Sequence, residues 1–275
     1  MHHANKRRAT AVLLATMALA ACNDGATDPS PADDQLIRDL AVSAGDAIAT
    51  EVGVFLGSEM TLHDGATSSV SVGSANASAR RSENCTFDGG SGRFNCTVVT
   101  DRGLTITRSF ALYDAGGNAQ DHYDRHTTAS ADFHTTVTGT LERDGYTATV
   151  ARSADATLSG LEGSETSRSW NGASSAEVSA EHVSDAGLRR YEKLATGTVS
   201  AVVVGVPRSE NPWPISGSIA HHVTVTRTRE GATDVSRTAS RRVVVTFNGT
   251  QFVPLTVNDI AFTLDLATGK ITRVE

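Results

Sequence analysis

The residues whose types and spacing could do chemistry are concentrated in the stretch 121–126, Asp-His-Tyr-Asp-Arg-His. On a β-strand, His122, Asp124 and His126 would project from one face, because successive strand side chains alternate between faces. His134 could then arrive from the neighbouring strand. Imidazoles together with a carboxylate can bind zinc or another divalent cation. This group is therefore the candidate metal site of the sequence.

The spacing of this group gives a metal site little support. His122 and His126 form a His-x-x-x-His pair, but the glutamate that accompanies such a pair in zinc metalloproteases is absent. A solvated strand face with polar residues at alternate positions would explain the same pattern. His221 and His222 are adjacent, so on a strand they would point to opposite faces. We therefore expect no tightly bound metal and no cofactor.

Other catalytic patterns are missing from the sequence. It contains no Gly-x-Ser-x-Gly nucleophile elbow and no Ser-x-x-Lys pattern, and the glycine-rich stretch 88–92 looks like a hairpin tip rather than a phosphate-binding loop. Trp213, between Pro212 and Pro214, is the most conspicuous loop aromatic. It could anchor a ligand or partner, or it could pack beneath its own loop. We expect a protein that is not an enzyme.

Two cysteines flank a glycine-rich turn and predict a disulfide. Folding the chain about Gly89-Gly90-Ser91-Gly92 places Cys85 opposite Cys96 and Phe87 opposite Phe94. Directly opposed strand residues have Cα atoms about 4.5 to 5.5 Å apart, within or near the bridging range. A metal site would require more thiols than two. The expected product is a hairpin closed by a Cys85–Cys96 disulfide.

The third cysteine belongs to the N-terminal segment. Lys6, Arg7 and Arg8 precede an apolar run from Ala9 to Leu19, which has the build of a secretory signal peptide. The last four residues, Leu19-Ala20-Ala21-Cys22, resemble the lipobox of bacterial lipoproteins. This resemblance covers only the first 22 residues. It implies removal of residues 1–21, acylation of Cys22 and attachment to a membrane through lipid.

The resemblance also places the protein in the cell envelope. An exported compartment permits disulfides, which agrees with the Cys85–Cys96 expectation. Asn23 follows the cysteine, where enteric lipoproteins kept at the inner membrane carry an aspartate, and this favours the outer membrane. Removal of residues 1–21 would take away three cations and no acid, so the net charge would change from −7 to −10. A chain this acidic has no general electrostatic attraction for nucleic acid.

The remaining residues predict a tether and a single domain. Residues 23–34 are polar, contain Gly25, Pro29 and Pro31, and are typical of a flexible linker, which makes 22–34 the tether and 35–275 the domain. The domain begins with an amphipathic helix whose apolar side chains recur at steps of three and four. These side chains are Leu36, Ile37, Leu40, Ala41, Ala44, Ala47, Ile48 and Val52.

From about Met60 onward the apolar pattern changes to period two. Turn signals such as Asp144-Gly145 and Asn248-Gly249 separate the segments, so sequential hairpins are expected. The sequence thus predicts a mainly β or α+β fold with about ten to twelve strands, in which the helix packs on a large twisted antiparallel meander that curls or partly closes. One face should be apolar, and the other, with its threonines and arginines, should face water. The expected strands include 104–112, 135–142, 146–152, 188–194, 198–206, 219–229, 241–248, 251–257, 260–266 and 270–274, with 207–214 as a loop.

These expectations describe a non-catalytic, lipid-anchored envelope protein with a binding or structural role. Aromatic residues make up only 5% of the chain, which suits extended sheet better than a large aromatic-lined pocket. Two alternatives remain: a carrier that holds an apolar ligand between helix and sheet, and a metal-dependent enzyme that uses the His122 group. The membrane, reached through the lipid anchor, is the one partner that the sequence predicts.

Acylation at Cys22 can be tested directly. We expect Cys22→Ser to abolish lipid attachment and to leave a soluble or uncleaved product, because the acylated cysteine would be the anchoring residue. Mass spectrometry of the mature N-terminus measures this. An unmodified N-terminus at another residue of the wild-type chain would contradict the expectation.

Overall fold

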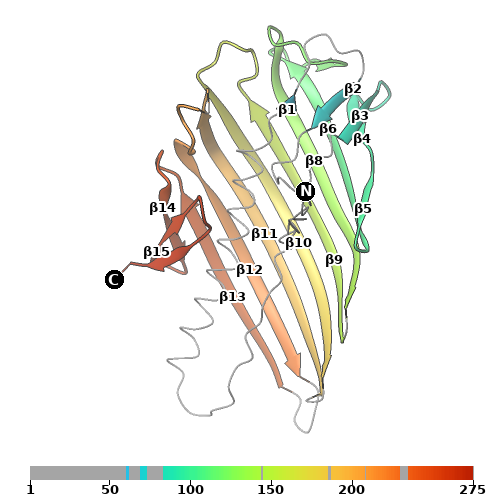
Figure 1. Cartoon of the computed structure of the whole chain (residues 1–275), viewed down its shortest axis with the longest axis vertical. Coiled ribbons are helices and arrows are strands. Elements are labelled where there is room, and N and C mark those ends of the chain that lie inside the picture. The colour runs from blue at the N-terminus through green and yellow to red at the C-terminus, as the bar shows by residue number, and fades with distance from the viewer. Residues whose placement is uncertain are drawn as a thin grey trace, which may run out of the picture.

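The structure is a computed structural model that describes residues 60–61, 69–72, 83–143, 145–184, 187–207, 209–229 and 235–274. Within these ranges the chain is all β, with sixteen strands in one antiparallel sheet and no helix (Figure 1). The expected meander is therefore confirmed. The signal peptide, the tether and the amphipathic helix lie outside the described residues.

The six longest strands, β8 to β13, form the body of the sheet and are joined in sequence order. Shorter strands precede and follow them, and these account for the larger strand count than the pattern predicts. The strands are β1 (Met60–Thr61), β2 (Ser69–Val72), β3 (Glu83–Asp88), β4 (Arg93–Cys96), β5 (Val99–Asp101), β6 (Leu104–Asp114), β7 (Ala119–Gln120), β8 (Thr128–Arg143), β9 (Tyr146–Ser159), β10 (Ser167–Ser184), β11 (Gly187–Gly205), β12 (Ser216–Arg229), β13 (Val235–Thr246), β14 (Phe252–Val257), β15 (Ile260–Asp265) and β16 (Ile271–Arg273).

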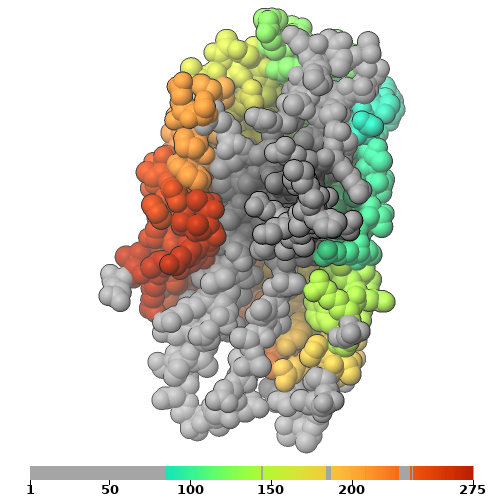
Figure 2. All heavy atoms as spheres, viewed as in Figure 1, coloured from blue at the N-terminus to red at the C-terminus, as the bar shows by residue number. Residues whose placement is uncertain are grey.

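The sheet is open. Its hydrogen-bonded order runs from β1 to β16 with β5 and β7 as side branches on β6, and no bond joins the first strands to the last. Figures 1 and 2 place the strands β3–β6 and β14–β16 at opposite margins of the molecule. The turns use residues that tolerate positive φ: Asn258 and Asp259, with φ of 45° and 69°, form the two-residue connection between β14 and β15.

A row of directly opposed side chains crosses the sheet on one face, which we call the inner face. Phe94 stacks on Phe110 with ring centroids 4.7 Å apart, and Phe133 contacts Phe110 at 6.0 Å. Full burial of an aromatic or branched side chain contributes about 1.5–3 kcal/mol to folding, so this row is a main source of stability. Its members are Phe94, Phe110, Phe133, Ala156, Gly172, Val199, Ile219, Val245, Leu255 and Phe262.

A β-bulge in β11 interrupts the register next to this row. Ala201 is the extra residue, with φ of 46°, and its N–H donates to Oδ1 of Asn171 on β10 at 2.8 Å. On the other side, a Cβ at Gly217 of β12 would lie 2.2 Å from the Ala201 carbonyl oxygen. The bulge therefore requires glycine at position 217. It brings Val202 and Val204 into the inner face, where both are buried.

The opposite, outer face of β8–β13 carries hydroxyl side chains, as expected from the alternating threonines. Thr226 and Thr238 share a hydrogen bond of 3.0 Å between β12 and β13. The expectation that the arginines would share this face is wrong, because the register places most of them on the inner face with the apolar residues. Long Arg and Lys stems can cover apolar surface while their charged ends stay near water. The segments 188–194 and 198–206 also prove to be one strand, β11.

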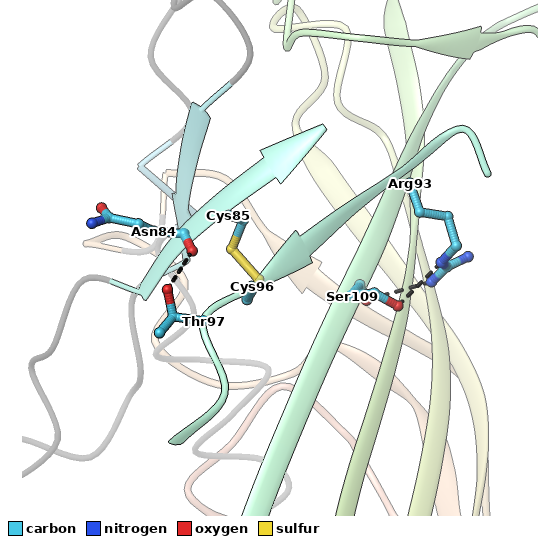
Figure 3. The surroundings of a disulfide bond; sticks show 6 residues. All are labelled: Asn84, Cys85, Arg93, Cys96, Thr97 and Ser109. Carbon is cyan, nitrogen blue, oxygen red and sulfur yellow. Dashed lines mark hydrogen bonds between the residues drawn. A yellow bond between two sulfur atoms is a disulfide. The ribbon is translucent and has the colours of Figure 1, made fainter. Parts of the chain in front are cut away.

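The hairpin of β3 and β4 confirms the predicted disulfide. Cys85 lies directly opposite Cys96 and the two form a disulfide bond (Figure 3). Phe87 lies opposite Phe94, with ring centroids 5.1 Å apart. Below the bridge, the Thr97 backbone N–H and hydroxyl both donate to the Asn84 carbonyl, at 3.0 and 3.1 Å. The bridge thus joins the hairpin to the aromatic end of the inner row.

Replacing both Cys85 and Cys96 with serine should lower the melting temperature without abolishing the fold. The disulfide closes a loop with a sequence separation of 11, which corresponds to about 3 kcal/mol in the chain-entropy model. Thermal unfolding followed by circular dichroism, with Cys22→Ser alone as the reference, measures the change. Two reactive thiols at these positions in the non-reduced protein would contradict the pairing.

Candidate functional site

The structure places the candidate metal ligands in a loop rather than on a strand. Residues 121–127 connect β7 to β8, so the expected shared strand face of His122, Asp124 and His126 does not exist. The loop is fixed by Tyr123, whose buried side chain donates from its hydroxyl to the Leu161 carbonyl at 3.1 Å. That contact joins positions 38 residues apart. This long-range hydrogen bond favours the loop over a longer strand. The alternation of residue types within 121–127 cannot predict it.

Each histidine of the group has its own local partner. His122 Nδ1 lies 2.6 Å from Oδ1 of Asp121, and the hydrogen bond to His122 lowers the pKa of that carboxyl. The backbone N–H of His126 donates to Oδ1 of Asp124 at 2.8 Å, and this bond lowers the pKa of Asp124. His134 lies on the outer face of β8, where its Nδ1 is 2.6 Å from Oδ1 of Asp155 on β9. The four residues are thus not brought together, and no described residues form a group of three or more metal-ligating side chains.

Trp213 lies in the loop between β11 and β12, which confirms the prediction of a loop at 207–214. Its side chain is half-buried and packs against the hydrophobic core. Of the two roles that the sequence left open, packing beneath its own loop agrees with this position. His221 and His222 also follow the expectation, because His221 is buried on the inner face and His222 is exposed on the outer face.

The most distinctive chemistry lies on the inner face, between the apolar row and the β8–β9 and β10–β11 turns. We call this part the basic half. Seven cations with described side chains lie at its strand positions, and Asp101, opposite Leu104 at the end of β5, is the one carboxylate at a described inner-face position here. The cations are Arg108, Arg143, Arg152, Arg189, Lys193, Arg227 and Arg241.

Several of these cations lack the partners that buried charges normally have. Burial and the nearby charge of Arg152 lower the pKa of Lys193, because both disfavour its charged form. The Nε atoms of Arg189 and Arg241 are buried and have no hydrogen-bond acceptor among the described residues, whereas Nη1 of Arg241 donates to the Ser240 carbonyl at 2.8 Å. A buried, unpaired donor on a charged group costs free energy. The basic half can therefore bind an anion.

The outer face differs from the basic half in its charge, which is negative, and in its shape. Six carboxylates lie on it between β8 and β11, namely Asp132, Glu142, Asp155, Glu177, Glu181 and Glu192. A shallow groove of about 680 Å³ also crosses this face from β8 to β12. The exposed side chain of Leu194 lies in it. Serine and threonine side chains form much of the remaining lining, and the surface that they expose there is mainly apolar; they include Thr136, Thr138, Ser175, Thr196 and Thr224.

Comparison with known proteins assigns the chain to no family: no family model, no curated protein and no solved structure matches it. Within the part of the chain that the structure describes, no helix has the length and apolar character needed to span a bilayer. Functional inference therefore depends on the two faces of the sheet.

The basic half is the feature that sequence reasoning missed. Its signal was present in β11, where Arg189, Tyr191 and Lys193 recur at every second position. The same period joins Arg227 to the apolar positions of β12. Following these positions from the buried Val199 and Ile219 would have assigned them to the inner face. Treating arginine as a marker of the solvent face hid the pattern.

The separation of the histidines predicts that the purified mature protein keeps no stoichiometric metal. After dialysis against a metal-free buffer, we expect far less than one zinc per chain by mass spectrometry of the elements. About one zinc per chain, lost in His126→Ala but retained in His222→Ala, would show that the loop 121–127 and β8 form a metal site after all.

Proposed function

We propose that this protein is a lipid-anchored, non-catalytic component of the cell envelope whose long sheet serves as a rigid binding surface. The lipobox resemblance at Cys22 supports the anchoring. The difference between the two faces of β8–β13 supports the binding role, because each face offers one kind of chemistry over several strands. An outer-membrane location is the form of this proposal that Asn23 favours.

The observation that carries the proposal is the outer face. It is a broad surface on which hydroxyl groups recur on neighbouring strands, and it carries a groove. Hydroxyls bonded to each other across strands, such as the Thr226–Thr238 pair, hold their neighbours in fixed positions. Leu194, with 57% of its surface exposed, adds an apolar contact within the groove. Exposed apolar side chains beside ordered polar groups are typical of interaction surfaces.

A carrier of an apolar ligand is the second candidate. The inner row supports it, since Val199, Ile219 and Val245 continue the apolar surface from β11 to β13. An acyl chain or another apolar molecule could lie along this row. The carrier would use the inner face, whereas the binding surface that we favour is the outer one, so the two candidates differ in the face that meets the ligand.

Photo-crosslinking from the outer face tests the proposal. A photoreactive amino acid replaces Leu194 in the groove or Phe252 on β14, and both native side chains are 57% exposed. In intact native cells we expect adducts with a specific envelope component from position 194 and not from position 252. Absence of adducts from position 194, or equal yields of the same adducts from both, would contradict a binding role for this face.

A further inference from the structure

The basic half of the inner face needs a source of negative charge. Its seven cations share one face, and like charges on neighbouring strands destabilise a sheet unless anions offset them. Carboxylates on the other face of the same strands point away from them. Two of these are already engaged, since Glu181 pairs with Arg190 at 2.8 Å and Asp155 bonds to His134. Asp101 is the one described carboxylate on the same face, so the described strands do not balance the charge of the basic half.

The chain itself contains a segment of complementary charge. Residues 23–59 hold eight carboxylates and a single cation, Arg38, so this segment carries a net charge of −7. The carboxylates are Asp24, Asp28, Asp33, Asp34, Asp39, Asp46, Glu51 and Glu59. No other stretch of similar length in the chain is so acidic. Its apolar positions, beginning with Leu36 and Ile37, suit the apolar row beside the basic half.

We propose that residues 23–59 dock on the inner face, with their carboxylates against the cations of the basic half. The partners most in need of such contact are Lys193 and the buried Nε groups of Arg189 and Arg241. A carboxylate is a strong acceptor for these donors. The apolar side chains of the segment then cover apolar side chains of the inner face. Charge pairing and apolar burial thus favour the same arrangement.

Length and attachment both permit this docking. A fully extended segment of this size spans about 120 Å, at about 3.3 Å per residue. The longest strand, β11, has 19 residues and spans about 60 Å at the same rise. Covalent attachment raises the effective concentration of a short tethered segment to the millimolar range. Weak individual contacts are therefore sufficient for occupancy.

Docking would determine how far the sheet can lie from the membrane. Cys22 immediately precedes the segment, so a docked segment leaves little free chain between the lipid anchor and the sheet. The inner face is then occupied by the chain itself, and the outer face with its groove remains for partners. The docking requires neither acylation nor the proposed binding role, so its test can fail independently of theirs.

The mature chain contains a natural pair of probes for this docking. After removal of residues 1–21 its only lysines are Lys193, on the basic half, and Lys270, which is exposed in the turn before β16. A carbodiimide joins a carboxylate to an amine only where the two are in contact. The test uses the complete mature chain with Cys22→Ser, treated with carbodiimide and analysed by mass spectrometry of its peptides.

We expect most crosslinks of residues 23–59 to involve Lys193 rather than Lys270. They should be largely lost in 1 M salt, where the Debye length falls to about 3 Å. They should also be lost when Asp24, Asp28, Asp33 and Asp34 are replaced by asparagine, although both lysines remain. Replacement of the outer-face Arg242 by glutamine serves as a control and should leave the crosslinks unchanged.

Three results would overturn the proposal. Residues 23–59 could crosslink equally to Lys193 and Lys270, which would indicate random collision. Lys193 could remain unlinked and as freely acetylated as Lys270, which would mean that nothing covers it. Lys193 could remain unlinked to the segment but become protected by dodecyl phosphate, which would assign the basic half to an external anionic amphiphile and favour the carrier.

Discussion

The strand register of the meander is the constraint on which the rest of the structure depends. Side chains alternate between faces at every residue, so a shift of one position would exchange the two faces of a whole strand. From β4 to β15 the register keeps one row of apolar residues together, from Phe94 through Ile219 to Phe262. The cost of exposing these side chains selects the observed pairing. All other inner-face residues follow from that choice.

The bulge at Ala201 shows how firmly this pairing is maintained. If the side chains of β11 alternated regularly beyond Val199, Val202 would lie on the outer face. Instead Asn171 accepts a hydrogen bond from the Ala201 N–H, and Gly217 leaves room for the displaced carbonyl. Neighbouring strands thus both adapt to one inserted residue, and the inner face remains continuous with the valines beyond it.

The charges are arranged by the same register. Once Val199 and Ile219 face inward, Lys193 and Arg227 must do so as well, because they lie an even number of residues away. The inner face is therefore both the apolar face and the cationic face. Surface charge is normally spread over both sides of a sheet that faces water. Its segregation here is the reason for assigning different partners to the two faces.

Features that depend on local sequence could be predicted. The Cys85–Cys96 pairing follows from residues within one hairpin. Gly145 likewise predicts a turn from its own local sequence, whatever the strands on either side pack against. The loop at His122 could not be predicted, since its anchor is the Leu161 carbonyl 38 residues away. The inward position of the arginines depended on a register that extends over six strands. Local alternation separates two faces but does not say which of them is buried.

The most direct test of the two-faced sheet is the accessibility of single cysteines along β11. Residues 191 to 196 are replaced one at a time in a chain that lacks Cys22, and each thiol is labelled in the folded protein. The register predicts rapid labelling at positions 192, 194 and 196 and slow labelling at 191, 193 and 195, in agreement with their alternating burial. Uniform labelling, or a reversed alternation, would contradict the assignment of the inner and outer faces.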